Sequence, residues 1–491
     1  MSYFVLLPIL FPILSGIFLL VRKEMKNRQS LLITVGAALV ITTVLAITAM
    51  LTVRDEIFLV FNLTRTLPVL FKIDGVGVIF GIVGIIVFVC AGSFGFEYMK
   101  HEEHEKRYYG FYLIVFGILM ALCFAGNLVT FYLFFELLTL SSMPLVLHTG
   151  SKEAVMAGLK YLFYSLCGAY MVLFGFYFIN RYANTLSFSE GSVLNPELAA
   201  GHASLLLGAA FVMIMGFSVK AGMFPMHAWL TAAHPAAPAP ASAVLSAVIV
   251  KAGVLGIIRV VYYLFGASFL QGTWVQSVWM TLALITVFMG SLLAYREPVL
   301  KKRLAYSTVS QISYILFGLA VMDPDALTGG MLHVICHSLV KAVLFLCAGA
   351  IIYKTGKTRA DELRGIGKEM PVLLWCYTVA SLGLVGIPPT GGFVSKWYLA
   401  AGALSSGIPG FSWIGPAVLL ISALLTAGYL LPITISGFFP GEDFDYGGLK
   451  KREPGVLMTL PIALLTALSV LAGLFPNVLT DFIAWLAANI L

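Results

Sequence analysis

Charged residues are scarce in this chain, at 11% of 491 residues, whereas hydrophobic residues make up 60% and the mean hydropathy is +0.97. Soluble domains carry about 25% charged residues, so a water-soluble globular protein is excluded. Intrinsic disorder is excluded as well, because disordered chains combine low hydrophobicity with high charge. No connection between the apolar runs exceeds about 25 residues, which leaves no soluble domain for a second activity. The composition therefore predicts an all-α polytopic membrane protein.

Paired cysteines are also absent. All six cysteines lie in apolar stretches, and none forms a CxxC or CxxH pair. A zinc site or an iron-sulfur cluster is therefore not supported, and we expect small buried side chains and no cofactor in this chain. The N-terminal apolar run carries its positive charges after it rather than before it, so it is interpreted as a first membrane helix and not as a cleavable signal.

Apolar windows predict fourteen membrane spans. They lie near residues 3–21, 29–51, 75–97, 110–125, 127–147, 154–180, 203–232 (interrupted), 240–265, 273–294, 304–322, 327–353, 371–403 (interrupted), 412–437 and 456–489. The last run is long enough to be tilted or to break at Pro476.

Basic residues alternate with these spans. The odd-numbered connections hold twenty lysines and arginines, and the even-numbered connections hold four: Arg54, Arg65, Lys72 and Arg181. Because cytoplasmic loops carry the excess of basic residues, both termini are predicted to lie outside, in a chain of the cell membrane. The net charge of +7 then faces the cytoplasm, and a nucleic-acid partner is not needed to explain it.

The remaining six basic residues lie inside predicted spans, as does one glutamate. They are Lys160, Lys220, Lys251, Arg259, Lys341, Lys396 and Glu136. A charge at the middle of a membrane costs about 2.5–3.5 kcal/mol on insertion scales, so such residues usually mark an ion path. Two alternatives stay open: Glu136 could serve packing through a hydrogen bond, and Arg259 could extend its side chain to the membrane surface.

Glycine and proline interrupt two of the spans. The first break follows Lys220 at Gly222 and Pro225 and leads to His227 and His234. Prolines after it predict that residues 233–240 do not form a regular helix. The second break, at residues 386–392, precedes Lys396. Broken helices at membrane depth are tolerated only in a wet cavity or inside protein, so both breaks are candidate parts of the path.

His333, His337 and Lys341 recur every four residues and share one helix face. One helical turn rises about 5.4 Å, a spacing at which a proton passes between titratable groups through one water. Histidine titrates near neutral pH, so this face predicts a proton relay. A metal site is the competing interpretation, but no carboxylate ligand is close in sequence and a lysine follows on the same face.

The two breaks are five spans apart, which predicts two inverted repeats. Residues 159–166 resemble residues 332–339, so that Lys160 matches His333, and Gly222 and Pro225 match Gly386 and Pro389. We therefore divide the chain into an N-terminal three-helix segment (1–109), a first five-helix repeat (110–265), an inverted second repeat (266–437) and a C-terminal helix (438–491).

Several motifs together resemble one family. They are residues 134–137 (FFEL), 141–144 (SSMP), 219–230 (VKAGMFPMHAWL), 234–238 (HPAAP), 250–254 (VKAGV), 304–311 (LAYSTVSQ) and 386–393 (GIPPTGGF). This set resembles the antiporter-like large subunits of Mrp-type Na⁺/H⁺ antiporters, respiratory complex I and membrane-bound hydrogenases.

The resemblance implies a function and roles for residues. It implies a proton-translocating subunit of a multisubunit antiporter or redox-driven complex, with other membrane subunits as partners and Na⁺ as an additional ion. It implies that Glu136 and Lys220 form the pair whose opening and closing drives transfer, that Lys251 is the central lysine and that Lys396 is the exit-side lysine. His333, His337 and Lys341 would form the relay, and His227 and His234 would match family histidines of less defined role.

Some placements and rival functions stay open. Because the sequence stops at Leu491, we expect no lateral arm helix, and Lys396 stands where one complex I homologue has a glutamate. An Mrp D-type subunit, a hydrogenase or related reductase counterpart, and a lysine-bearing complex I homologue remain. The rivals are a quinone-binding redox subunit, a stand-alone solute/proton symporter and a non-conducting anchor. The lack of ligand motifs and the chain of buried charges favour an ion path.

Overall fold

The computed structural model of the chain describes residues 2–23, 25–445 and 450–491. Its first half contains η1 (Ser2–Leu6), α1 (Leu7–Val21), α2 (Arg28–Thr52), β1 (Ile57–Thr64), β2 (Leu67–Lys72), α3 (Gly75–Tyr98), η2 (Met99–His101), α4 (Glu105–Cys123), α5 (Leu128–Val146), α6 (Lys152–Tyr182), α7 (Pro196–Ala199), α8 (Ala203–Ala221), α9 (Ala228–Ala236), α10 (Ala239–Val244), η3 (Leu245–Ile249), α11 (Lys251–Ile258) and η4 (Arg259–Phe265). The second half contains α12 (Ala267–Leu270), α13 (Trp274–Arg296), α14 (Leu300–Val321), α15 (Pro324–Thr355), η5 (Ala360–Leu363), α16 (Ile366–Glu369), α17 (Pro371–Val385), α18 (Gly391–Ser405), α19 (Phe411–Phe438), α20 (Val456–Leu474) and α21 (Asn477–Ile490).

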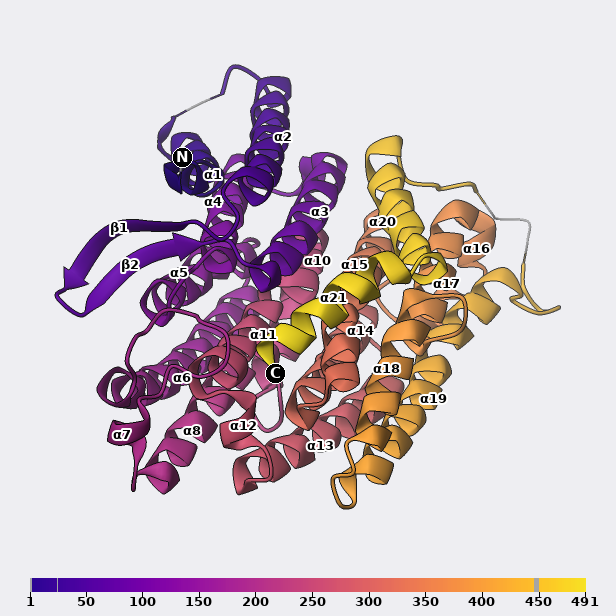
Figure 1. Ribbon diagram of the computed structural model, residues 1–491. Coiled ribbons are helices and arrows are strands. Elements are labelled where there is room, and N and C mark those ends of the chain that lie inside the picture. The colour runs from indigo at the N-terminus through magenta and orange to yellow at the C-terminus, as the bar shows by residue number, and fades with distance from the viewer. Residues whose placement is uncertain (1, 24, 446–449) are drawn as a thin grey trace.

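Thirteen helical segments of the described chain are long and apolar enough to cross a membrane. The predicted twelfth span is interrupted, as expected, and consists of the shorter helices α17 and α18 on either side of residues 386–390. The predicted last span breaks at Phe475 and Pro476, so that α21 leaves the line of α20 and crosses in front of α15 (Figure 1). The all-α membrane fold is confirmed, whereas the count of fourteen spans and the inverted repeat stay predictions.

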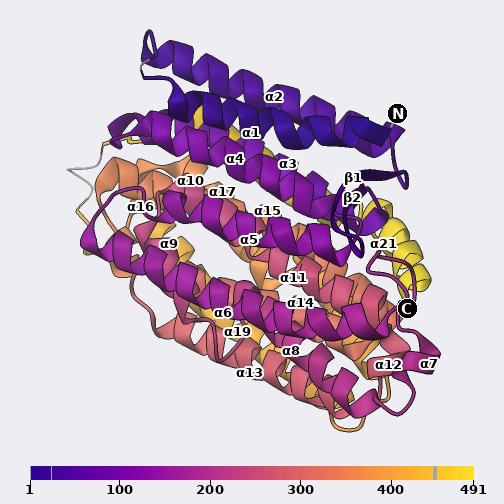
Figure 2. The ribbon, with the colours of Figure 1, turned by 90° about the vertical axis from the view of Figure 1, so that its left-hand side faces the viewer.

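The helices share a common long direction and have two distinct ends (Figure 2). The termini and the β1–β2 hairpin lie toward one end, here called the hairpin end, and α16 lies toward the other, here called the basic end. The antiparallel hairpin pairs Ile57 with Lys72 and Phe58 with Phe71. The hairpin was not predicted, because β1 is almost entirely exposed and lacks the alternation of buried and exposed residues that marks a half-buried strand.

Both predicted breaks are interruptions of helices. Gly222 ends α8 at a φ of 79°, and Gly386 ends α17 at a φ of 90°. Glycine adopts this left-handed conformation without steric cost, which is why it stands at both positions. The C-terminal end of α8, just before Gly222, is stabilised by the Trp229 indole N–H, which donates to the Val219 carbonyl over 2.8 Å.

The expectation that residues 233–240 do not form a regular helix was wrong in its first part. Helix α9 continues through His234 and Pro235 to Ala236, and the chain leaves it only at Ala237 and Pro238. Pro235 lies near the end of α9, where the helix loses only one hydrogen bond to it. Pro240 lies in the first turn of α10, where a missing N–H costs little.

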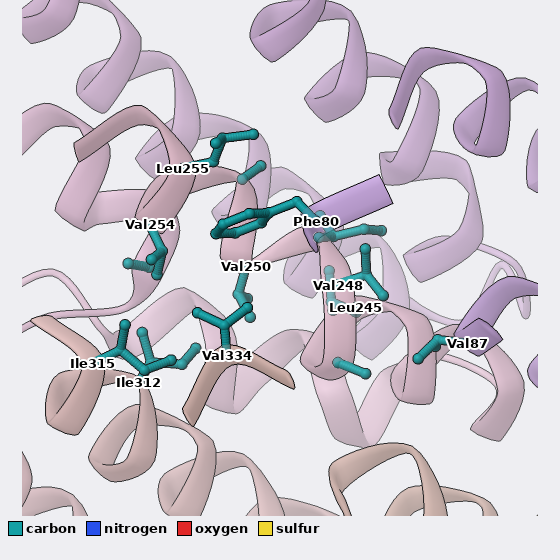
Figure 3. Packing of buried hydrophobic residues seen from close by; sticks show 14 of the residues in the cluster. Phe80, Val87, Leu245, Val248, Val250, Val254, Leu255, Ile312, Ile315 and Val334 are labelled. Carbon is teal, nitrogen blue, oxygen red and sulfur yellow. The ribbon is translucent and has the colours of Figure 1, made fainter. Parts of the chain in front are cut away.

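The segment α10–η4 runs through the centre of the chain and is entirely buried. Its side chains pack against α3, α14 and α15, as Phe80, Val250 and Val334 illustrate (Figure 3). Two π-helical segments, η3 and η4, flank the α-helical turns of α11. Gly253 lets α11 approach α8, because a side chain there would come within 2.5 Å of the Phe217 carbonyl. This close approach places Lys251 beside the helix that carries Lys220.

Arg259 does not extend to the membrane surface, so that alternative was wrong. Its side chain is 1% exposed and forms a bidentate ion pair with Asp74, the N-cap of α3. The guanidinium also stacks on Phe188 and Tyr263 at 4.7 and 4.8 Å from the ring centroids. Burial raises the pKa of Asp74, but the charge and hydrogen bonds of Arg259 outweigh burial and hold that pKa below its usual range. The pair therefore fastens η4 to the start of α3.

Arg259→Met should destabilise the chain by about 3–5 kcal/mol, because it leaves the carboxylate of Asp74 buried without a partner. Asp74→Asn with Arg259→Met should recover part of this loss. The apparent Tm of the purified complex measures both. The stabilisation from Asp74 should be present above a pH of about 3.9 and be lost as the pH falls through the lowered pKa. An unchanged Tm for Arg259→Met would contradict a structural role for the pair.

Candidate functional site

Buried basic side chains form a series through the middle of the chain. Lys220, Lys251, Lys341, His333 and His337 are each at most 2% exposed. With the half-buried Lys396 they are called the axis below. Lys160 was predicted to belong with them, but it lies on the exposed face of α6, outside the axis.

Lys220 lies in the last turn of α8, just before the first break. Its ammonium donates to the Thr139 hydroxyl over 2.8 Å and to the Tyr161 hydroxyl over 2.6 Å. It also lies 4.5 Å from the centroid of the Tyr161 ring. Tyr161 is the residue that the sequence analysis missed here, because a tyrosine in an apolar helix gives no signal of its own. Polar groups of α5 and α6 thus hold Lys220 at the start of the axis.

Glu136 is half-buried on α5, one turn before Thr139. The charge of Glu136 is the main charge that acts on Lys220. The charge of Lys220 is likewise the main charge that acts on Glu136. Its Oε1 atom is buried and has no hydrogen-bond partner among the described residues. The packing alternative required such a hydrogen bond. Glu136 therefore lies within electrostatic range of Lys220, and its Oε1 is not fixed by a hydrogen bond to the described residues.

Lys251 lies at the first turn of α11, directly after the π-helical turn η3. Its ammonium donates to the carbonyl of Ser246 over 2.8 Å. π-Helical turns inside α-helices frequently occur at functional sites, because they widen the helix and redirect its carbonyls. The Ser246 hydroxyl in turn bonds Thr308 on α14 over 2.8 Å. These contacts connect α11 to the helix that faces α15.

Lys341 lies near the middle of α15. Its ammonium donates to the carbonyl of Leu304 over 3.0 Å and to the hydroxyl of Ser307, both on α14. Lys341 and Lys251 act on one another electrostatically. The two central lysines therefore lie on different helices and are both bonded to uncharged oxygens.

His337 and His333 continue the series along α15. Their rings stack with centroids 5.8 Å apart and an interplanar angle of 14°. His333 bonds the Ser395 hydroxyl over 2.8 Å and the side-chain oxygen of Gln311 over 3.1 Å. Both ring nitrogens of His337 are buried and have no partner in the described part of the chain. Buried polar groups without a protein partner are usually bonded to water, so His337 is suited to exchange protons through water.

Lys396 lies on α18, after the second break. Its ammonium donates to the carbonyls of Leu384 and Val385 over 2.7 and 2.9 Å. These are carbonyls that the end of α17 leaves without helical partners. Lys396 also lies 4.9 Å from the centroid of the Tyr314 ring, on which His333 stacks. The second break thus brings Lys396 to the end of the histidine series.

The two histidines near the first break lie apart from each other. His227 is half-buried at the N-cap of α9, and the charge of Lys160 acts on it. His234 is completely buried on α9 and stacks on Phe345 at 4.6 Å between centroids. Neither ring nitrogen of His234 has a partner among the described residues. Of the two, only His234 lies inside the protein near the axis.

Lys301 is a buried cation that the sequence analysis placed in a connection. It lies in the first turn of α14, is 8% exposed and donates to the Ala237 carbonyl over 2.8 Å. Its neighbour Lys302 pairs with Glu297 over 2.9 Å on the surface. The sequence shows only a run of three basic residues, 301–303, and does not indicate that Lys301 points inward.

The metal interpretation of His333 and His337 lacks ligands in the structure. No group of three His, Cys, Asp or Glu side chains gathers in a metal-binding arrangement within the described ranges. His333 is also occupied by Ser395 and Gln311. The geometry fits proton exchange among titratable groups better than coordination of an ion.

Known proteins resemble the chain over most of its length. Residues 125–428 match the family model described as NADH:quinone oxidoreductase/Mrp antiporter, TM. NADH-quinone oxidoreductase subunit N of Desulforudis audaxviator is 32% identical over 77% of this chain and 74% of its own. The D-type subunit of the Na(+)/H(+) antiporter of Bacillus subtilis is 27% identical over 100% of this chain and 98% of its own.

Solved structures share the fold. A chain of the Mrp complex from Dietzia sp. DQ12-45-1b superposes with a TM-score of 0.86 at 22% identity, covering 100% of this chain and 98% of that one. A chain of an archaeal membrane-bound sulfane sulfur reductase superposes with a TM-score of 0.85 at 23% identity, covering 99% and 97%. The family match spans more than half of the chain, including the whole axis. This chain is therefore a multi-pass membrane protein that belongs to the NADH:quinone oxidoreductase/Mrp antiporter family of membrane subunits.

Proposed function

We propose that this chain is the proton-translocating membrane subunit of a multisubunit complex, either an Mrp-type Na⁺/H⁺ antiporter or a related redox-driven complex. The observation that carries the proposal is the axis. Its lysines and histidines cross the chain from the first helix break at Lys220 to the second at Lys396. Relatives over nearly the full length include the D-type subunit of an Na(+)/H(+) antiporter and an F(420)H(2) dehydrogenase subunit N.

In the proposed transfer, the charge of Glu136 controls the affinity of Lys220 for its proton. A carboxylate close to an ammonium stabilises its charged form. When Glu136 moves away, Lys220 gives up a proton to Lys251 through water. The proton then passes through Lys341, His337 and His333 to Lys396, to which the family resemblance assigns the exit side. The return of Glu136 raises the affinity of Lys220 for a proton again, and Lys220 takes up the next proton.

Glu136 is well placed to respond to a neighbouring subunit. Its side chain is half-buried at the side of α5, whereas Lys220 and Lys251 are enclosed by the protein. A charge that approaches α5 from a partner would compete with Lys220 for this carboxylate. A movement of charge in a partner subunit would thereby drive proton transfer in this chain, and the chain itself would need no cofactor.

Protons, rather than sodium ions, are the proposed cargo of this chain. Sodium sites need several oxygen ligands, and the axis consists of ammonium and imidazole groups, which repel or do not bind a hard cation. Sodium would then cross in another subunit of an antiporter.

Purification of the native complex through a tag on this chain tests the assignment. Mass spectrometry should find other antiporter-like subunits, with small hydrophobic partners in an antiporter and with redox subunits in an electron-driven pump. In liposomes the complex should acidify or alkalinise the lumen, as a pH-sensitive dye reports. A chain that purifies alone and transports a solute with protons would contradict the proposal.

We also propose that both termini face the outside of the cell membrane, with the basic end in the cytoplasm. Thr185→Cys at the hairpin end should react with a membrane-impermeant maleimide in intact cells, whereas Thr358→Cys at the basic end should react only after the cells are opened. Both threonines are exposed, so they form a matched pair. The opposite labelling pattern would invert the topology.

A further inference from the structure

A polar cavity of about 260 Å³ lies at the basic end, between the α3–α4 and α5–α6 connections. Its lining includes Glu102, Arg107 and His148. Burial and the charge of Arg107 lower the pKa of His148 to about 4, so this histidine is uncharged at neutral pH. His101, Glu103 and His104 also line the cavity, but all three are exposed. Glu102 is the half-buried carboxyl of the lining, and its charge acts on the buried Lys301.

Glu102 is half-buried between this cavity and the start of α14. Burial raises the pKa of its carboxyl above the ordinary value, against the opposing charge of Lys301. Tyr98 and Tyr108 also face it, and the Tyr108 hydroxyl is buried with no partner in the described residues. A carboxyl that is reached from the cavity and tends to keep its proton is suited to collect protons.

Lys301 continues inward from Glu102. Its side chain is 8% exposed, and its ammonium donates to the carbonyl of Ala237 over 2.8 Å. Ala237 lies in the short non-helical link between α9 and α10. The Ser242 hydroxyl also reaches this link, over 2.8 Å to the His234 carbonyl and 3.3 Å to that of Ala237. Lys301 is thus anchored one helical turn from His234.

His234 bridges the distance between Lys301 and the axis. The charges that act on its ring are those of Lys341, Lys301 and Lys251. Its ring stacks on Phe345, and the Lys341 ammonium lies 5.9 Å from the centroid of that same ring. Both ring nitrogens are completely buried and unbonded within the described chain. His234 therefore makes no hydrogen bond to the described residues and lies within electrostatic range of three lysines.

We propose that Glu102 and Lys301 form the proton intake at the basic end, which refills the axis through His234 at Lys341 and Lys251. The inference rests on the proposed function and adds the route by which protons reach the axis. The Glu102 carboxyl takes a proton from the cavity and passes it through water to Lys301. His234 then accepts that proton on one ring nitrogen and releases one from the other toward Lys341.

The test is the initial rate of proton transfer by the native complex in liposomes, per assembled complex. Glu102→Gln should lower this rate at least tenfold, within the range for removal of an acid–base group. Glu102→Asp should restore most of it. Glu103→Gln, which removes an exposed charge from the same cavity wall, should leave the rate unchanged. Lys301→Met should match Glu102→Gln, whereas Lys302→Met should not.

A pH profile separates proton collection from a structural role. In Glu102→His, the rate should depend on the pH at the basic end with a midpoint shifted toward about 6.5, the ordinary pKa of histidine. If Glu102→Gln transports protons like the wild type while Lys251→Met does not, the proposed intake through Glu102 is wrong. The axis would still be the proton path. If neither variant loses transport, the proposed function fails as well. A Glu102→His profile that keeps the wild-type midpoint would also overturn the intake.

Discussion

Replacing Lys251 by methionine should lower the rate of proton translocation by about 100-fold or more, the range for losing a positioned proton donor. Lys251 is 1% exposed and lies at the centre of the axis, where it is bonded to the carbonyl of Ser246. Methionine keeps most of the side-chain volume but cannot hold a proton. The flux of protons into liposomes that contain the native complex measures the effect.

A matched control for this variant is Lys160→Met. Lys160 also lies on a membrane helix, but on the exposed face of α6 outside the axis. Its replacement should leave the proton flux within about twofold of the wild type, since it removes no member of the relay. Assembly is checked in both variants by the recovery of partner subunits. If Lys251→Met translocates protons at the wild-type rate, the axis is not the path.

Replacing His337 by glutamine should cause a loss of similar size, about 100-fold. Glutamine preserves polarity and hydrogen bonding but does not titrate near neutral pH. His337 is 1% exposed, has both ring nitrogens unbonded among the described residues and stacks on His333. No other imidazole of α15 lies between Lys341 and His333, so this step has no substitute on that helix.

Cys347→Ala on the same helix provides the comparison for His337→Gln. Its thiol is also completely buried, and it contacts the carbonyl of Leu373 rather than the axis. Proton flux should be retained in Cys347→Ala. Wild-type flux in His337→Gln would mean that protons cross the chain without the histidine series.

Much of the site could be predicted because membranes make buried charge conspicuous. In an apolar helix Glu136, Lys220 and Lys251 stand out at once, since each charge costs energy and such residues usually mark a functional path. The helix breaks at Gly222 and Gly386 were equally readable, since each follows from the chemistry of one residue type. The four-residue spacing placed His333, His337 and Lys341 on one face without any knowledge of the fold.

The residues that the sequence concealed depend on contacts between distant segments. Arg259 pairs with Asp74 across 185 residues of sequence, so hydropathy alone could not show that its charge is neutralised inside the protein. Lys301 stands in a basic run that follows the rule for cytoplasmic connections, yet it points inward while Lys302 points outward. Successive residues of a helix point in different directions, and the register of α14 against α9 decides which one is buried. Tyr161 was missed for the same reason, because its contact with Lys220 joins α6 to α8.

The arrangement also explains why the second helix break and the non-helical link between α9 and α10 matter more than their sequence would suggest. The end of α17 supplies the carbonyls that hold Lys396, and the link after α9 supplies the carbonyl that holds Lys301. Each break converts backbone atoms that a regular helix would use for itself into partners for a buried ammonium group. A chain without these breaks would bury the same lysines with fewer hydrogen bonds.

The most direct test of the account is the proton flux of two variants at opposite ends of the axis, Lys220→Met and Lys396→Met, alone and combined. If Lys220 and Lys396 belong to one path, each single variant should remove nearly all of the flux, and the double variant should be no slower, because residues that act as a unit are not additive. If each single variant keeps a large part of the flux and only the double variant loses it, the two lysines serve separate paths and the axis is wrong.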